Sequence, residues 1–219
     1  LFTNNIIKIG ENTGNDKNNL VENFYTVNIG DSAGVGSSGN SYTIFMGHEA
    51  GRNTHRASGS VVIGAKAGQG SVSGIDSVII GNHAASGASG VFDSVVIGKF
   101  AGQDTTLVDN IVAIGQYAAS GLENNSEDNV ALGYYTLSNT VLSTGVNAIG
   151  FKAASNSSGV YRTVSIGHEA SKRLHGADNV VSIGRGNLNF ASGIQDVESI
   201  GTETLLRASG AIRRTTAIG

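Results

Sequence analysis

Four ring side chains recur at almost constant spacing and are the first candidates for a binding function. His83, Phe100, Tyr117 and Tyr135 are separated by 17, 17 and 18 residues. If the chain is built from stacked repeats, equivalent side chains lie about 5 Å apart, and stacked rings are favourable by roughly 0.5–1.5 kcal/mol per pair beyond their burial. Two interpretations stay open: a structural ladder, within or between chains, and an exposed platform on which a glycan stacks.

Two histidine-containing segments are the candidates for metal binding. GHEAGRNTH (Gly47 to His55) and GHEASKRLH (Gly167 to His175) place His, Glu and His at identical positions of a repeat. A metal ion needs its ligands to converge, but the two segments are seven repeats apart in the chain. We therefore interpret these residues as solvated or interchain polar groups, and we predict no metal site and no cofactor. A ring of histidines that traps an ion on a threefold axis is the alternative hypothesis.

Residues for catalysis do not stand out. The chain has no Cys, and its many serines reflect an abundance of small residues rather than one activated nucleophile. Asp76 and Asp93, followed by Asn110 near the same register, are the one short carboxylate series. Each stands just before an expected strand, where Asp and Asn favour turns. We predict that the chain has no catalytic residues and is not an enzyme.

These spacings come from a repeat that covers almost the whole chain. SVVIG, SVIIG and SVVIG occupy residues 60–64, 77–81 and 94–98, and the glycine that ends each phrase, here called the anchor, can be followed to both ends. Nine of the twelve intervals between anchors are 17 residues, two are 18 and the first is 20. The anchors are Gly10, Gly30, Gly47, Gly64, Gly81, Gly98, Gly115, Gly133, Gly150, Gly167, Gly184, Gly201 and Gly219.

Each position of the repeat has its own chemistry. The residue before the anchor is aliphatic in all 13 copies, the residue three before it is Val or Ile in ten, and the residue between them varies. This alternation is typical of a half-buried strand. Ala stands three residues after the anchor in eight of eleven interior repeats, for example at Ala67 and Ala84. Each repeat is therefore predicted to be a short strand, a glycine corner and a second segment with a small inward side chain.

The repeat predicts the fold class and the domain organisation. One unit cannot bury its few apolar groups, whereas stacked units can. We predict an all-β fold, a parallel β-roll or β-solenoid with about 13 rungs of ~17 residues, on the order of 60 Å long. Residues 1–30 are expected to form irregular first rungs or a junction, and residues 31–219 one continuous repeat domain of a longer chain. The extra residue before Gly133 is expected in a polar loop over residues 122–128.

The composition fits a solenoid better than an ordinary globular core. Of 219 residues, 32 are Gly and none is Pro, Cys or Trp, while 6% are aromatic and 14% charged. A formal net charge of −3 gives no general attraction to nucleic acids or anionic membranes. No run of about 18 apolar residues is present to span a bilayer. We therefore expect no nucleic-acid partner and no membrane insertion of this segment.

An apolar column is predicted to lie outside the roll. The alternation of the strand makes the residue two before the anchor point away from the residues on either side of it. Over six consecutive repeats this residue is apolar, and such a strip is too long to leave in water. We therefore predict that it is buried against identical chains. The predicted trimer strip is Val62, Ile79, Val96, Ala113, Ala131 and Ala148.

The phrases resemble the repeats of two groups of fibrous proteins. SVVIG, SVIIG, NVALG and VNAIG resemble the head repeats of trimeric autotransporter adhesins. NVALGYYTLSNTVLSTGVNAIGFKA, from Asn129 to Ala153, resembles more closely the repeat of phage tail fibres and related bacterial surface fibres. The resemblance implies a left-handed β-roll with three chains side by side. The period of 17 residues is longer than that of the usual adhesin-head repeat, so longer loops are expected.

On this resemblance we expect an extracellular segment of a trimeric phage tail fibre that extends the fibre and attaches it to a host surface. Its partners would be two further copies of the chain and a host-surface glycan or protein. The loops Asn12–Asn23 and Leu122–Asp128 are expected to face outward and to be able to touch the receptor. The alternative is the head domain of a trimeric adhesin on a bacterial cell surface.

Two more distant alternatives come from other classes of solenoid. A polysaccharide-degrading solenoid would need carboxylates that persist over neighbouring rungs. An ice-binding solenoid would need a flat, exposed array of Thr or similar side chains. The column four residues before the anchor is the candidate array, although Ile111 and Asn129 interrupt it; its members are Thr26, Thr43, Ser60, Ser77 and Ser94.

Overall fold

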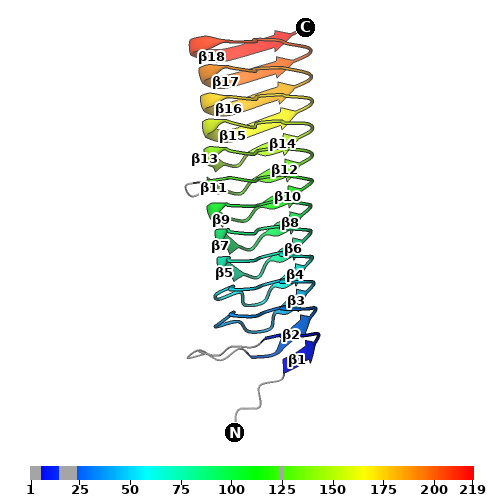
Figure 1. Ribbon diagram of the computed structural model, residues 1–219. Coiled ribbons are helices and arrows are strands. Elements are labelled where there is room, and N and C mark those ends of the chain that lie inside the picture. Colours follow the sequence, from blue (N-terminus) through cyan, green and yellow to red (C-terminus); the bar gives the residue numbers. More distant parts are fainter. Residues whose placement is uncertain (1–5, 15–23, 124–125) are drawn as a thin grey trace.

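The computed structural model describes residues 6–14, 24–123 and 126–219, and these residues form a parallel β-solenoid. Eighteen strands form one sheet system in which every pairing is parallel, and no helix occurs in the described part of the chain. The solenoid has about 12 turns with rungs of about 17 residues, which confirms the predicted fold class. Figure 1 shows the rungs stacked along one axis, with the two termini at opposite ends.

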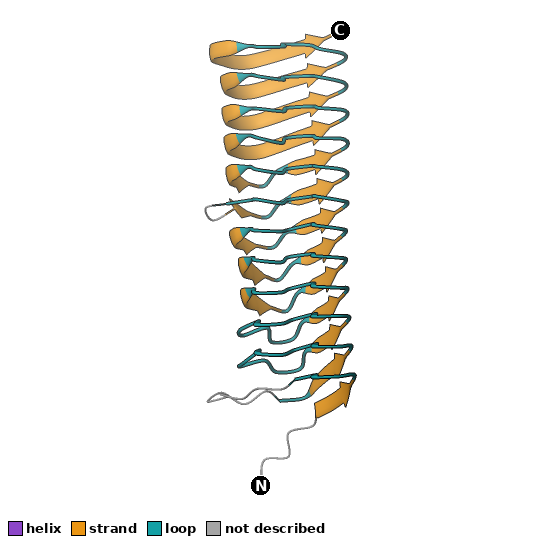
Figure 2. Cartoon of the chain, viewed as in Figure 1, coloured by secondary structure: helices purple, strands orange, loops and turns teal. Residues whose placement is uncertain are grey.

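Each turn contributes one or two strands, separated by a turn segment that follows the anchor (Figure 2). The strands that lead into an anchor are β1 (Ile6–Ile9), β2 (Thr26–Ile29), β3 (Ile44–Met46), β4 (Val61–Ile63), β6 (Val78–Ile80), β8 (Val95–Ile97), β10 (Val112–Ile114), β12 (Val130–Leu132) and β14 (Asn147–Ile149). The second strands are β5 (Val72–Ile75), β7 (Ser89–Phe92), β9 (Thr106–Asp109), β11 (Ser126–Glu127) and β13 (Val141–Thr144). In the last four rungs both merge, as β15 (Ser158–Ile166), β16 (His175–Ile183), β17 (Ser192–Ile200) and β18 (Ser209–Ile218).

The register follows the sequence repeat, including its irregular intervals. In the 18-residue interval before Gly133, Glu123 pairs with Val141, whereas Ser126 pairs with Val108, so the extra residue lies between Glu123 and Ser126. This confirms its predicted place. The expected outward loop is only partly outward, because Leu122 and Ser126 are buried. Most of the other expected loop, Asn12–Asn23, lies outside the described residues.

The anchor glycines form the corner at which each rung leaves its strand. The anchors from Gly10 to Gly201 have φ between 126° and 141°, which side chains of L-residues rarely allow. A Cβ on Gly64 would lie 2.7 Å from the carbonyl carbon of Gly81, the anchor of the next rung. The backbone N–H of Gly64 also donates to the carbonyl of Met46 in the preceding rung (2.8 Å). The anchor must therefore be glycine both for its dihedral angles and for the close approach of the next backbone.

The inward positions include one that the sequence placed outside. Ala67, Ala84 and the other alanines three residues after the anchor are fully buried, as predicted. The predicted trimer strip is also buried, which contradicts its predicted outward direction: all six side chains are at most 4% exposed. The prediction was wrong because both faces of these strands are apolar, so the alternation alone does not say which face lines the core. The buried column is Val62, Ile79, Val96, Ala113, Ala131 and Ala148.

The buried residue of the strand and the residue four after the anchor compensate each other in size. Val62 contacts the position of Gly68, where a Cβ would lie 3.2 Å from its Cγ1, and a Cβ on Gly51 would overlap the ring of Phe45. Further along the stack the sizes are reversed, because Ala131 is followed by Leu137, which is also buried. The total volume within a rung therefore stays nearly constant, as a densely packed interior requires.

Small polar side chains fill much of the remaining core and bond to backbone groups of the next rung. The column that was the candidate ice-binding array is buried, so it offers no surface to ice. Its hydroxyls instead accept from the backbone: Ser60 Oγ from the N–H of Ser77, and Ser77 Oγ from the N–H of Ser94 (both 3.3 Å). Another buried hydroxyl, that of Ser71, donates to the carbonyl of Ala85 (2.6 Å). These bonds allow a core with few large apolar residues, because buried polar groups then keep partners.

Two glycines of one rung separate the roles of the corner and of an ordinary turn. Gly64→Ala is expected to destabilise the fold by about 3 kcal/mol or more, because it combines a forbidden φ with a backbone clash. Gly70→Ala is the matched control: its φ is +69° and nothing lies within 4 Å of the added Cβ, so a loss of about 1 kcal/mol is expected. Urea unfolding followed by circular dichroism measures both. Equal losses would contradict the corner's special role.

The size compensation predicts a rescue. Phe45→Ala is expected to lose about 3–5 kcal/mol through the cavity that it leaves. The double variant Phe45→Ala/Gly51→Leu recreates the pair of sizes at Ala131 and Leu137, and Leu137 already adopts a positive φ of 53° at the equivalent position. We expect the double variant to regain more than half of the lost free energy of unfolding. A double variant no more stable than Phe45→Ala would show that the two positions do not share one space.

Candidate functional site

The four predicted ring side chains form a continuous stack along the outside of the solenoid. Ring centroids are 5.1 Å apart between His83 and Phe100, 4.9 Å between Phe100 and Tyr117, and 4.4 Å between Tyr117 and Tyr135. Each residue stands two after an anchor, with φ between 53° and 59°. The glycine corner thus turns the chain so that this column projects outward at every rung. The predicted stacking of these four rings is confirmed.

The stack continues through three rings that sequence reasoning missed. Tyr134 contacts Tyr135 edge-on at 4.6 Å and stacks on Phe151 at 5.5 Å, and Phe151 stacks on His168 at 4.8 Å. These residues stand one after the anchor, in the neighbouring column. Their own spacing of 17 residues was the signal that could have revealed them. The whole set is called the ring ladder below: His83, Phe100, Tyr117, Tyr135, Tyr134, Phe151 and His168.

The ring ladder is a partly wet surface edged by cations. Tyr134 is 41% exposed and Phe151 37% exposed. The Nζ atoms of Lys99 and Lys152 lie 5.1 and 4.9 Å from the ring centroids of Phe100 and Phe151, within the range of cation–π attraction. Desolvation, together with the neighbouring tyrosines 117 and 134, raises the pKa of the Tyr135 phenol, so this ring stays neutral near pH 7. The surface therefore offers neutral rings, hydroxyls and ammonium groups, but no carboxylate pair.

The two histidine-containing segments do not converge on a metal site. His48 Nε2 lies 3.6 Å from a carboxylate oxygen of Asp31, and His55 Nδ1 is hydrogen-bonded to Ser38 Oγ at 2.7 Å. His175 repeats the second contact with Ser158 (2.8 Å). Across the described ranges, no group of three or more His, Cys, Asp or Glu side chains could hold a metal ion.

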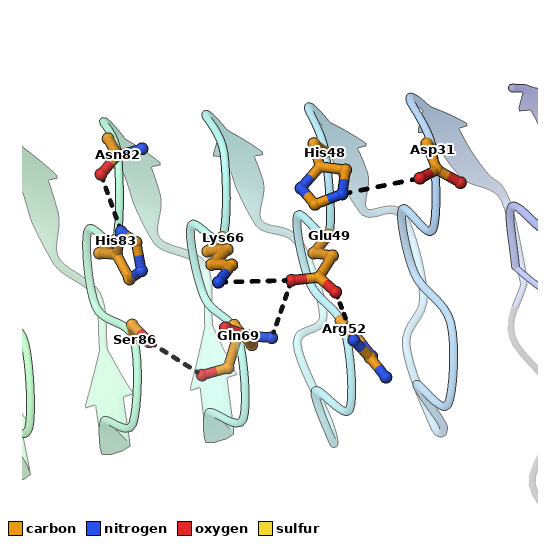
Figure 3. A network of polar contacts seen from close by, with 9 residues as sticks. All are labelled: Asp31, His48, Glu49, Arg52, Lys66, Gln69, Asn82, His83 and Ser86. Atoms are coloured by element: carbon orange, nitrogen blue, oxygen red, sulfur yellow. Dashed lines mark hydrogen bonds and ion pairs between the residues drawn. The ribbon is translucent and has the colours of Figure 1, made fainter. Parts of the chain in front are cut away.

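The glutamates of these segments instead form ion pairs on the surface. Glu49 pairs with Arg52, lies 3.8 Å from Lys66 Nζ and accepts a hydrogen bond from Gln69 Nε2 at 3.3 Å (Figure 3). Partial desolvation raises the pKa of Glu49, but the hydrogen bond and charge of Arg52 and the charge of Lys66 outweigh it and hold that pKa below its ordinary value.

The equivalent carboxylate 120 residues later is held in the same way. Lys172 Nζ donates to Glu169 Oε1 at 2.7 Å, and this hydrogen bond is the main reason that the pKa of Glu169 lies below its ordinary value. Burial opposes the shift, whereas the charges of Lys172, His168 and Lys152 add to it. The potential around Glu169 is therefore positive.

The short carboxylate series has a local role in the backbone. Asp76, Asp93 and Asn110 are exposed and have φ of 52°, 47° and 53°. They are equivalent turn residues in successive rungs, as predicted, and Asp and Asn tolerate this conformation better than most residues.

The outer face of the strands is lined by two columns of aliphatic side chains, none of them buried. They stand one and three residues before the anchor, and Ile114 is 41% exposed. The parallel register places each side chain directly over its equivalent in the next rung, for example Val61 over Val78 and Ile63 over Ile80. This outer aliphatic strip consists of Val27, Ile29, Ile44, Met46, Val61, Ile63, Val78, Ile80, Val95, Ile97, Val112, Ile114, Val130, Leu132, Ile149, Val164, Ile166, Val181, Ile183 and Ile200.

Towards the C-terminal end the outer aliphatic strip becomes polar. Glu198 and Thr216 replace the valine of earlier rungs, and Thr216 Oγ1 donates to Glu198 at 3.4 Å. Nearby, Arg162 pairs with Asp178, and Asn179 Nδ2 donates to Asp196 at 3.0 Å. The strip thus has an apolar length and a charged end.

Comparisons with known proteins add no family to these observations. A scan against protein-family models finds no model that matches the chain, and a search of curated proteins finds no significant match. Nor does the described part of the chain contain a helix long and apolar enough to cross a membrane. The resemblance of the repeat phrases to fibre proteins therefore remains an expectation from the sequence.

The lowered pKa of Glu169 gives a pH-dependent prediction. Because the folded value lies below the ordinary value of 4.5, the pair with Lys172 stabilises the fold above about pH 4.5, and this contribution is lost as the pH falls through the folded value. Glu169→Gln is expected to lower the free energy of unfolding by up to about 1 kcal/mol at pH 7. Thermal unfolding at pH 7 and at pH 3 should show the difference from the parent chain shrinking at pH 3.

The control for this prediction is Glu127→Gln, since Glu127 has no ion pair among the described residues. Its substitution should change stability little at either pH. A loss for Glu169→Gln that is equally large at pH 3 would contradict the assignment to the ion pair.

Proposed function

We propose that this chain is a structural and receptor-binding segment of an extracellular homotrimeric fibre, of the kind that phage tail fibres use to attach to a host surface. The observation that carries the proposal is the outer aliphatic strip, an apolar surface that continues over eleven consecutive rungs, from Val27 to Ile200. The proposed role is extension and attachment rather than catalysis.

The size of the outer aliphatic strip supports a permanent contact. With rungs about 4.8 Å apart and two columns about 7 Å apart, the strip is about 50 Å long and about 10 Å wide, or on the order of 500 Å². This is near the upper end of the largest apolar patches on ordinary monomers, about 300–600 Å², which are often functional. Two facing strips would bury on the order of 1,000 Å², about the least that a specific interface needs.

A second and third copy of this chain are the occupants that the strip fits best. Its side chains repeat with the rung spacing, so a partner needs the same spacing to match it along the whole length, and an identical chain has it. The fibre families that the phrases resemble place three chains side by side, which gives the expected number. A closed threefold arrangement also hides the same surface on every copy. This set of residues replaces the inner column first predicted for the interface.

The native mass of the folded segment tests the proposal. We expect a species three times the mass of the 22.3 kDa chain at low micromolar concentration by light scattering or native mass spectrometry. The variant Ile80→Gln/Ile97→Gln/Ile114→Gln should shift the mass towards the monomer or cause aggregation, because it places amides in the outer aliphatic strip. The matched control, Val72→Gln/Leu107→Gln/Leu142→Gln, changes three exposed aliphatic residues on another side of the rung and should remain trimeric.

Two outcomes would overturn the proposal. A stable, soluble monomer of the parent chain would remove the trimer, and an interface disrupted equally by both triple variants would remove the assignment to the strip. Attachment is measured separately with fluorescently labelled segment. Binding to bacterial cells is expected for a tail fibre, and binding to collagen-coated surfaces without binding to bacteria would point to an adhesin head instead.

A further inference from the structure

A cleft opens on the outside of the solenoid beside the end of the ring ladder. Its volume is about 370 Å³, and three consecutive rungs contribute to it from equivalent positions. Tyr134 and Tyr135 form one end, Lys152 comes from the middle rung, and Lys172 and Arg173 from the third. Asn139 and further serine and asparagine side chains complete a polar wall. Neither tyrosine belongs to the outer aliphatic strip, so the cleft is a separate surface.

The cleft carries more positive charge than its ion pairs neutralise. Lys172 pairs with Glu169 at 2.7 Å. Lys152 and Arg173 have no ion pair among the described residues; their cations lie 4.9 Å and 4.8 Å from the ring centroids of Phe151 and Phe190. Three cations thus share one carboxylate, on a chain whose formal net charge is −3. Rings hold two of these cations without neutralising them, so they stay available to an anion.

The same columns at the other end of the stack lack this excess. Lys66 and Arg52 are the positional equivalents of Lys152 and Lys172, and Glu49 approaches both of them (Figure 3). The position of Tyr134 is occupied there by Asp31 in the rung of Gly30 and by His48 in the rung of Gly47. The chain therefore contains, in equivalent positions, one cation pair that is neutralised and one that is open and bordered by tyrosines.

Rings beside open cations are suited to an acidic sugar. A pyranose ring stacks its C–H face on an exposed aromatic ring, and Tyr134 is 41% exposed. Amide and hydroxyl groups of the wall can bond to sugar hydroxyls, while Lys and Arg bind carboxylate, sulfate or phosphate groups. We propose that the cleft of Tyr134, Tyr135, Asn139, Lys152, Lys172 and Arg173 binds an acidic saccharide. This inference rests on the proposed attachment function and specifies the class of its receptor.

Titration calorimetry of the full segment at physiological salt tests the inference with three probes of similar length. The probes are hexagalacturonic acid, which carries carboxylates, a heparin-derived hexasaccharide, which carries sulfates, and neutral maltohexaose. We expect saturable binding of at least one acidic probe and at least tenfold weaker binding of maltohexaose. The acidic probe that binds more tightly identifies the anionic group that the cleft prefers.

Matched variants distinguish a site from general attraction. Lys152→Gln/Lys172→Gln should weaken binding of the acidic probe at least tenfold. Lys66→Gln/Arg52→Gln makes the same change of charge at equivalent positions and also removes a Glu partner, and it should leave binding within twofold of the parent. Tyr134→Ala keeps all cations and should still weaken binding several-fold. Native mass and circular dichroism confirm that each variant keeps its assembly and fold.

The inference is overturned if the neutral probe binds as tightly as the acidic ones, if no probe binds, or if both double variants weaken binding equally. Its failure is distinguishable from failure of the proposed function. A trimer that attaches to cells but binds no acidic probe would overturn only the inference, whereas a monomer that binds an acidic probe through the cleft would overturn the trimer and leave the cleft.

Discussion

The rise of this solenoid is set by a contact between backbones that only glycine permits. At each corner the anchor takes a φ that side chains do not tolerate, and the carbonyl of the next anchor lies where a Cβ would be. This contact fixes the strand leading into the corner and the column of rings leaving it. The outer aliphatic strip and the ring ladder both lie beside the corner, so the regularity of each surface depends on the same glycines. A side chain at one corner would separate two rungs and interrupt both surfaces together.

The interior satisfies a second constraint, constant volume per rung, with variable chemistry. Phe45 faces Gly51, whereas the alanine at 131 is matched by a leucine at 137. Small hydroxyl groups bond to backbone groups of the next rung instead of contributing apolar area. Stability therefore comes from contacts between neighbouring rungs, since no single rung encloses a core of its own. The outer surface is then free to vary from rung to rung, which is how open cations and tyrosines can occur together at one level only.

The fold was predictable from the sequence because the period itself carries the information. A glycine every 17 residues and a small residue three positions later predict stacked rungs, and the stacking of Phe100 on Tyr117 follows from their spacing. The direction of the strand side chains was not predictable from the alternation, because Val62 and its two neighbours Val61 and Ile63 are all apolar. Only the size of the residue facing Val62, Gly68, tells which one is inside, and that pairing needs the three-dimensional path. The cleft needed the structure for a similar reason, since Tyr134 and Arg173 are far apart in the chain and their charges balance only in space.

The equality of the rungs has a consequence for how such a chain can change during evolution. A unit from one anchor to the next, such as residues 82–98, enters and leaves the stack in the same register and ends with the same corner. Unequal recombination that deletes or duplicates one such unit would shorten or lengthen the rod by about 4.8 Å and keep every remaining pairing in place. Length can then drift in discrete steps without passing through an unfolded intermediate sequence. The 18-residue units behave differently, because each brings its own bulge along, so their positions record which rungs have been copied.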